Sequence, residues 1–144
     1  MTQTPTPAID PLARAERLRV AAQAIEERLH PAAVLLYGSV ASGRAGPTSD
    51  VDIAVLLGAP RPSLQILGEL RAALEAVLGC AVDLTILDGA SPILAMQVLR
   101  NHRVLAERDP QALEDFVVRT LTDYFDLKHV RRPIEEALLK PRST

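Results

Sequence analysis

A Gly-Ser pair and two closely spaced aspartates have the residue types and spacing of a phosphate-transfer site. Gly38-Ser39 is followed, after ten intervening residues, by Asp50-Val51-Asp52. Alternate side chains of a strand point to the same face, so Asp50 and Asp52 are expected to project together, about 7 Å apart along the chain. Paired carboxylates repel each other in a core but suit hard divalent cations, and Mg²⁺ completes its ligand shell with water and substrate phosphates. The pair therefore predicts a magnesium site; the structural alternative is a cap and turn before the strand, in which Ser49 and Asp50 close the loop.

A third carboxylate, Asp83, lies within the apolar run 81–87. A charge in a buried strand needs a partner, so solubility does not explain it. If this run and the strand of Asp50 and Asp52 are neighbours, the three carboxylates can hold two metal ions. One ion would lower the pKa of an attacking hydroxyl, and the other would bridge the phosphates and the leaving group. The alternative is structural: Asp83 pairs with an arginine such as Arg103.

Gly38 and Ser39 are candidate contacts for a nucleotide phosphate. Glycine lets the backbone approach a phosphate closely, and the Ser39 hydroxyl and N–H stand at the start of the following turn or helix, where donors converge on anions. Arg44 is the arginine best placed by position to assist them, although most arginines here are expected on solvated surfaces. Transfer of a phosphoryl-type group needs little beyond this positioning and charge neutralisation.

The elements that must position these residues alternate between helix and strand. Three dipeptides, Asp10-Pro11, Ser91-Pro92 and Asp109-Pro110, have the N-cap residue followed by proline that is typical of helix starts. Together with the hydrophobic periodicity they predict, in chain order, a helix 11–29, strands 33–37 and 51–57, a helix 63–78 ended by Gly79, a strand 81–87, a helix 92–101, an edge strand 104–106 and a helix from 110 that Pro133 should break. The predicted class is α/β (α+β), a small mixed sheet flanked by helices.

The domain organisation is expected to be simple. A chain of 144 residues accommodates one domain. We expect a flexible N-terminus at 1–9, the domain at 10–126 and a C-terminal tail at 127–144. The tail is more apolar than a solvated terminus needs, so it either folds back onto the domain or docks on a partner.

Composition excludes several classes of protein. Hydrophobic residues make up 48%, which suits a globular core, whereas aromatics at 3% and a net charge of −2 disfavour direct binding of nucleic acid. One cysteine, Cys80, excludes an internal disulfide and fits a small core residue in a reducing compartment. No apolar run is long enough for a membrane span, and the start lacks the pattern of a signal peptide, so a cytoplasmic protein is expected.

The remaining candidates have simpler interpretations. Tyr37 is expected to pack at the end of the first strand. His102 and His129 are expected at the surface or at helix ends, because a histidine-based zinc site needs clustered partners that this sequence lacks.

Taken together, Gly38-Ser39, Asp50-Val51-Asp52 and the later Asp83 resemble the signature of the polymerase-beta-like nucleotidyltransferase superfamily. Size and layout are similar to its minimal nucleotidyltransferase (MNT) branch, the antitoxins paired with HEPN-type toxins. The resemblance covers about residues 12–110 by element order. One departure is that Ser42, instead of arginine, precedes Gly43, with Arg44 after it.

The resemblance implies a role for each matched residue. Asp50 and Asp52 would bind both Mg²⁺ ions, Asp83 would bind the ion that activates the hydroxyl, and Gly38 and Ser39 would contact the nucleotide phosphates. The implied reaction is AMPylation: AMP passes from ATP to a tyrosine of a HEPN-type RNase toxin, which is thereby silenced within a hetero-oligomer.

Two alternatives to this reaction remain open. The first is a nucleotidyltransferase that acts on a small molecule, as aminoglycoside-modifying enzymes do. Only about one helix and a tail follow the predicted sheet, too little for a domain that binds such an acceptor. The second is a catalytically inactive module that neutralises its partner by binding alone.

Overall fold

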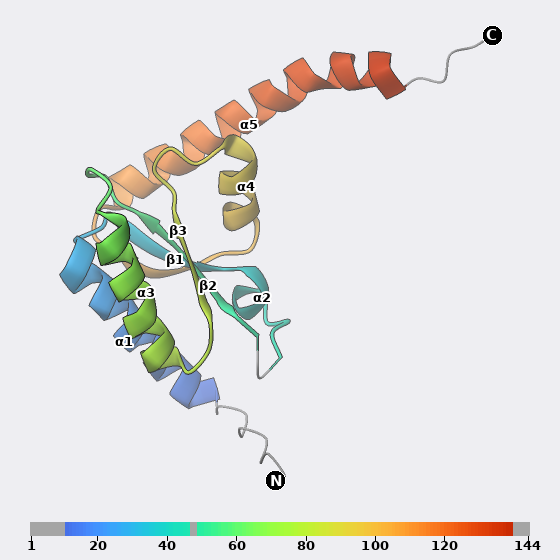
Figure 1. The fold of residues 1–144 in the computed structure, drawn as a ribbon. Helices are drawn as coiled ribbons and strands as arrows, with labels where there is room; N and C mark the ends of the chain where they lie inside the picture. Colours follow the sequence, from blue (N-terminus) through green and yellow to red (C-terminus); the bar gives the residue numbers. More distant parts are fainter. Residues whose placement is uncertain (1–10, 47–48, 140–144) are drawn as a thin grey trace.

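The computed structural model describes residues 11–46 and 49–139 of the chain (Figure 1). The expected flexible segment 1–9 and the predicted cap Asp10 lie outside the described residues. The predicted strands and long helices are present, and their ends agree within one or two residues except at the last helix. In chain order the elements are α1 (Pro11–Leu29), β1 (Ala33–Tyr37), α2 (Gly38–Ala41), β2 (Val51–Leu56), α3 (Leu64–Leu78), β3 (Val82–Ile86), α4 (Pro92–Arg100), β4 (Arg103–Glu107) and α5 (Pro110–Leu139).

The four strands form one mixed sheet in the order β3-β2-β1-β4. β1 is antiparallel to both β2 and β4, and β2 is parallel to β3. The parallel pair is connected through α3, as a crossover between parallel strands requires. The predicted fold class, a small mixed sheet flanked by helices, is confirmed.

Helices cover both faces of the sheet (Figure 1). α1 and α3 lie against the face to which Val34, Ile53 and Val55 point, and α4 and α5 contribute residues to a second cluster on the face of Leu35 and Ala54. Each of these five strand residues is fully buried. Because adjacent strand residues point to opposite faces, residues 52, 54 and 56 face the α4–α5 layer. This alternation decides on which face Asp52 lies.

The helix ends follow the local signals in the sequence. The hydroxyl of Ser91 accepts the backbone N–H of Leu94 at 3.1 Å, and the carboxylate of Asp109 accepts the N–H of Ala112 at 3.1 Å. Gly79 ends α3 in the left-handed conformation with φ of 70°. Each contact satisfies a backbone group that the helix leaves without an internal partner.

Helix α5 differs from the prediction, because it continues through Pro133 to Leu139. The prediction of a break was wrong. Proline removes one backbone donor, but hydrogen bonds in the turns on either side can keep a helix of 30 residues continuous. The helix thus crosses the expected boundary at 126/127, and its second half projects away from the sheet (Figure 1). Residues 140–144 of the expected tail lie outside the described part.

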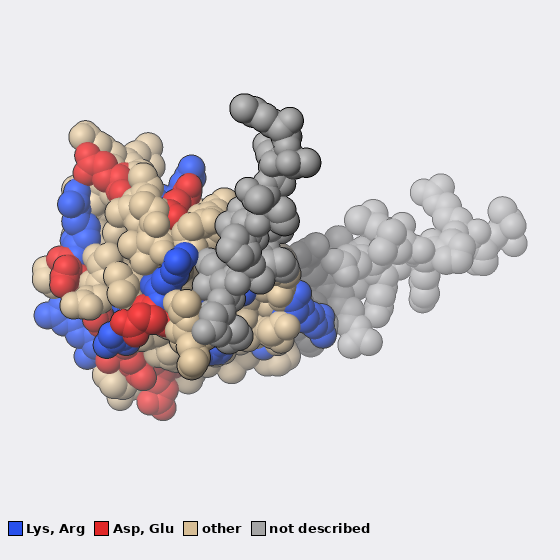
Figure 2. Space-filling view, turned by 90° about the horizontal axis from the view of Figure 1, so that it is seen from below, with Lys and Arg blue, Asp and Glu red and all other residues tan. Residues whose placement is uncertain are grey.

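The charge distribution on the surface and the apolar content of the helices complete the description of the fold. On the face in Figure 2, acidic and basic side chains are interspersed, and neither sign forms a continuous patch. In the described part of the chain, no helix combines the length and the apolar content needed to cross a membrane.

Candidate active site

Three polar side chains form a row across the sheet where β1 ends and β2 begins. Tyr37 is the partner of Asp52 in the antiparallel pair, and Asp52 is the partner of Asp83 in the parallel pair. Residues directly opposite each other on adjacent strands share a face and lie close together. The predicted neighbourhood of the two aspartate-bearing strands is therefore confirmed, and it places Asp83 beside Asp52.

Asp50 immediately precedes β2, and its charge acts on Asp52. The backbone N–H of Val51 donates to the carbonyl of Ala81 at 3.0 Å, which fixes this end of β2 against the start of β3. The pKa of Asp52 is raised, firstly by burial and then by the negative charges of Asp83 and Asp50. Asp83 is thus the strand partner of Asp52, Asp50 lies two residues before it, and both add negative charge near Asp52; the three predicted carboxylates are called the acidic cluster below.

The acidic cluster is open and does not form a closed metal cage. Asp50 and Asp83 are exposed, and Asp52 is partly buried. Within the described ranges, no three Asp, Glu, His or Cys side chains are grouped closely enough to hold a metal ion by themselves. The neighbouring carboxylates repel one another when no cation is bound. They nevertheless fit Mg²⁺, because this ion normally retains water and takes substrate phosphates as further ligands.

Gly38 is required where it stands for two reasons. Its φ is +76°, in the left-handed region that favours glycine, and a Cβ at this position would overlap the carboxylate of Asp52. The backbone thus passes directly against the central member of the acidic cluster. A side chain at residue 38 would have to displace that carboxylate.

The residues after Gly38 turn back towards it. α2 is a single turn that begins at Gly38, and the loop beyond it is held by the N–H of Arg44, which donates to the carbonyl of Ser39 at 3.0 Å. The Ser42 hydroxyl donates to the same carbonyl at 3.1 Å. Ser39 and Arg44 are therefore neighbours through their backbones, and the Arg44 side chain is exposed.

Tyr37 also belongs to the site, although the sequence predicts only a packing role for it. Its hydroxyl lies 2.9 Å from the hydroxyl of Thr85 and donates to the carboxylate of Asp83 at 3.3 Å. Burial, partly offset by the bond to Thr85, raises the pKa of Tyr37, and the charges of Asp83 and Asp52 raise it further. Because Tyr37 is the strand partner of Asp52, its position could have indicated a place in the site. That pairing, however, is known only once the register of β1 and β2 is known.

The prediction that Asp83 lies in a buried strand is wrong. The apolar run 81–87 predicts a buried strand, but β3 is an edge strand and Asp83 is exposed. The alternative pairing with Arg103 is also excluded, because β3 and β4 lie at opposite edges of the sheet. Asp83 is thus accessible to ligands instead of being neutralised within a core.

The other singled-out residues lie outside this site. Nδ1 of His102 is 2.7 Å from the carbonyl of Leu99 at the end of α4, as expected for a helix-end histidine. Cys80 is partly buried and packs against the α1–α3 core. The side chain of His129 lies outside the described part.

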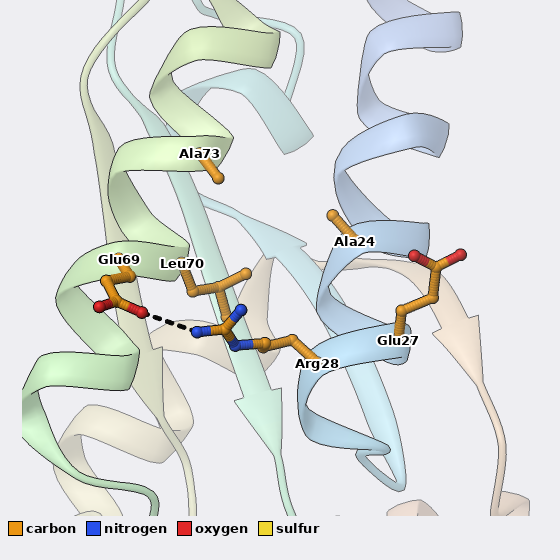
Figure 3. A pocket seen from close by; sticks show the side chains of 6 residues that line it. All are labelled: Ala24, Glu27, Arg28, Glu69, Leu70 and Ala73. Atoms are coloured by element: carbon orange, nitrogen blue, oxygen red, sulfur yellow. Dashed lines mark hydrogen bonds and ion pairs between the residues drawn. The ribbon is translucent and has the colours of Figure 1, made fainter.

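A groove between α1 and α3 is a separate feature (Figure 3). Glu27, Leu70 and Ala73 contribute to its lining, and an ion pair between Arg28 and Glu69, with N and O atoms 2.7 Å apart, spans it. Both helices pack on the sheet face opposite Asp52. The groove is therefore remote from the acidic cluster.

Replacing Asp52 by Asn should stabilise the protein in the absence of divalent cations near neutral pH. An acid whose pKa is raised by folding contributes stability only while protonated, and it loses that contribution as the pH rises through its pKa in the folded state. The variant lacks the ionised carboxylate, so its unfolding free energy should increase by about 1 kcal/mol or less for this partly exposed group. Thermal unfolding in the presence of a chelator, from pH 7 downward, measures the difference.

The pH dependence distinguishes charge repulsion from any other effect of Asp52→Asn. The gain should shrink as the pH approaches about 4, where an ordinary aspartate is half protonated. A variant that is less stable than the wild type at pH 7 would contradict the repulsion and would mean that Asp52 accepts a stabilising hydrogen bond.

Comparison with known proteins gives one family and several related structures. The family described as "Polymerase beta, Nucleotidyltransferase" matches residues 21–111, a range that contains the acidic cluster and Tyr37. A chain from the crystal structure of a toxin–antitoxin with AMP-PNP is 29% identical, with a TM-score of 0.69, and the match covers 83% of this chain and 98% of that one. No curated protein matches the sequence.

Two further structures extend the comparison. A chain of a MntA–HpeT toxin–antitoxin mutant is 25% identical with a TM-score of 0.72, over 85% of this chain and 98% of that chain. A chain from the tri-AMPylated Shewanella oneidensis HEPN toxin in complex with MNT antitoxin is 27% identical, with a TM-score of 0.65, over 85% and 99% of the two chains. The similarity therefore spans nearly the whole length of these neighbours.

Proposed function

Since the chain belongs to the polymerase beta nucleotidyltransferase family, we propose that it transfers AMP from ATP to a tyrosine hydroxyl of a HEPN-type toxin and acts as that toxin's antitoxin. The observation that carries the proposal is the acidic cluster, with Gly38 leaving no room for a side chain beside the Asp52 carboxylate. Among the neighbours, one toxin–antitoxin is seen with AMP-PNP, and one MNT antitoxin is in complex with an AMPylated HEPN toxin.

We assign metal binding to Asp50, Asp52 and Asp83. The donor set fits, because carboxylate oxygens are the protein ligands that Mg²⁺ prefers and their mutual repulsion is relieved by a cation. Asp50 and Asp52 would hold both ions and Asp83 one of them. When bound, Mg²⁺ would lower the pKa of the acceptor hydroxyl and neutralise charge on the triphosphate.

The residues of the chain orient the two reactants. In the proposed reaction, the acceptor oxygen bonds to the α-phosphorus of ATP, the bond from that phosphorus to the bridging oxygen breaks, pyrophosphate leaves and the hydroxyl proton is released towards the acidic cluster. In this proposal Gly38 would let the backbone approach the triphosphate, and the Ser39 hydroxyl and N–H would donate to it. Arg44 is the candidate for a further phosphate contact.

An exposed apolar stripe supports a protein as the acceptor. Val118, Leu121 and Phe125 lie on α5 at helical spacing, and Phe125 is 60% exposed. Large apolar side chains gathered on one helix face are typical of protein-binding surfaces. We therefore infer that α5 contributes to docking of the toxin, which presents its tyrosine to the acidic cluster.

Intact mass spectrometry of the coexpressed toxin tests the proposed reaction. We expect mass increases of one or more AMP groups on the toxin, and transfer by the purified proteins that depends on both ATP and Mg²⁺. Peptide mapping should place the groups on tyrosine. A toxin that carries no nucleotide under any of these conditions would rule the reaction out, whereas adducts on an added small alcohol would favour a small-molecule acceptor.

A further inference from the structure

The hydroxyl of Tyr37 joins two residues of the edge strand β3. Its oxygen is 2.9 Å from Oγ1 of Thr85 and 3.3 Å from Oδ2 of Asp83. If Tyr37 donates its single proton to the carboxylate, the Thr85 hydroxyl must donate to Tyr37. The geometry therefore contains a directed chain of hydrogen bonds, from Thr85 through Tyr37 to Asp83.

The fold makes this contact possible by placing a small residue beneath the tyrosine. Tyr37 belongs to β1 and Thr85 to β3, so the side chain crosses β2, whose residue opposite Thr85 is Ala54. Ala54 is fully buried on the same face, and the Tyr37 ring packs against the apolar cluster that contains it. The ring is thus held by packing at one end, and its hydroxyl is placed by Thr85 at the other.

Asp83 otherwise has little to hold it. It lies on an edge strand and is exposed, and in the described part of the chain Tyr37 is the only side chain that hydrogen-bonds its carboxylate. An exposed aspartate samples several rotamers, and ordering it costs side-chain entropy at the moment a ligand binds. A fixed donor to one carboxylate oxygen reduces that cost and leaves the other oxygen free.

We propose that Tyr37, anchored by Thr85, is a positioning residue that fixes the Asp83 carboxylate for binding a divalent cation. This inference rests on the proposed binding of a divalent cation by the acidic cluster, but not on the proposed transfer of AMP. Hydrogen-bond partners of metal-ligating carboxylates orient the ligand, and their loss typically costs about 10–100-fold in metal affinity or activity. Tyr37 acts through Asp83 and contacts no reacting atom in this scheme.

Direct titration of Mn²⁺, followed by the electron paramagnetic resonance of the free ion, tests the positioning role on the purified protein. Tyr37→Phe keeps the ring and its packing but removes the hydroxyl, and we expect it to weaken Mn²⁺ binding by about 10-fold or more. Thr85→Val, which removes only the anchoring hydroxyl, should act in the same direction with a smaller effect. Tyr124→Phe is the matched control, since it also removes a tyrosine hydroxyl, but one that accepts from Arg100 at 3.1 Å instead of donating to Asp83.

A double-mutant cycle separates positioning from a structural role. If Tyr37 acts through Asp83, Tyr37→Phe should have no further effect on Mn²⁺ binding in an Asp83→Asn background. Equal effects of Tyr37→Phe in both backgrounds, or unchanged Mn²⁺ affinity in both Tyr37→Phe and Thr85→Val, would overturn the proposal. Thermal unfolding of each variant verifies that it is folded.

The transfer reaction provides a second readout that distinguishes this inference from the proposed function. With the toxin as acceptor, Tyr37→Phe should raise the Mg²⁺ concentration for half-maximal rate by about 10-fold and leave the rate at saturating Mg²⁺ much less affected. A wild type that binds Mn²⁺ in a Tyr37-dependent manner but transfers no nucleotide would refute the proposed function and leave the positioning role in place. A uniformly lower rate with an unchanged Mg²⁺ requirement would contradict positioning.

Discussion

Simultaneous replacement of Asp50 and Asp52 by Asn should reduce AMP transfer to the toxin by at least about 1,000-fold and leave the toxin active. Removal of one preorganised charge-stabilising group from an active site typically costs about 100–1,000-fold in rate. These two aspartates are the proposed ligands of both Mg²⁺ ions, and asparagine cannot supply the charge that holds them. The rate is measured with purified proteins and ATP, and toxin silencing is measured by growth of cells that coexpress the pair.

The control for the double variant Asp50→Asn, Asp52→Asn also removes two negative charges, but at a site remote from the acidic cluster. Glu27→Gln with Glu69→Gln makes the same change in net charge within the groove between α1 and α3 (Figure 3), on the opposite face of the sheet. This control should retain transfer and silencing. If the aspartate variant still silences the toxin at normal expression, neutralisation proceeds by binding alone, and the enzymatic account of the antitoxin is wrong.

Substitution of Gly38 by Ala should impair both stability and transfer. The left-handed backbone at φ of +76° costs a residue with a Cβ about 1–2 kcal/mol, and the methyl group would also overlap the Asp52 carboxylate. Displacement of that carboxylate disturbs the centre of the acidic cluster, where misplacement by about 1 Å can cost 100-fold in rate. We therefore expect a loss of unfolding free energy of about 1–3 kcal/mol and a fall in transfer of about 100-fold.

Gly89→Ala separates backbone strain from displacement of Asp52. Gly89 has almost the same φ, +77°, but a Cβ there would meet no atom within 4 Å. This variant should lose a similar part of its stability and keep its transfer rate when assayed below its melting temperature. Equal transfer rates in the Gly38 and Gly89 variants would show that the close approach to Asp52 does not matter for the reaction.

These two experiments address different halves of the proposal. The aspartate pair tests whether negative charge at the start of β2 is needed, and Gly38 tests whether the position of that charge is needed. A phosphate-transfer site requires both, because charge neutralisation and alignment of the reactants contribute separately to the rate. A binding-only antitoxin requires neither.

Local signals in the sequence were sufficient for nearly all helices and strands. The cap residues Ser91 and Asp109 make the predicted hydrogen bonds to the backbone, and Gly79 adopts the left-handed conformation expected at the end of a helix. Such interactions span at most four residues, so the residue types alone predict them. Pro133 is the exception: it predicts a break in the helix, but the surrounding turns of α5 continue through it.

The sequence by itself determined which groups are available, namely carboxylates at Asp50, Asp52 and Asp83 with a Gly-Ser pair upstream, and these groups suit a divalent cation and a phosphate. Only the tertiary structure decided how these groups meet. Strand order placed Asp83 on an exposed edge beside Asp52, and strand register brought the Tyr37 hydroxyl across β2 to Asp83. The physical reason is that pairing between strands joins residues some 46 positions apart, a contact that no local propensity or spacing encodes.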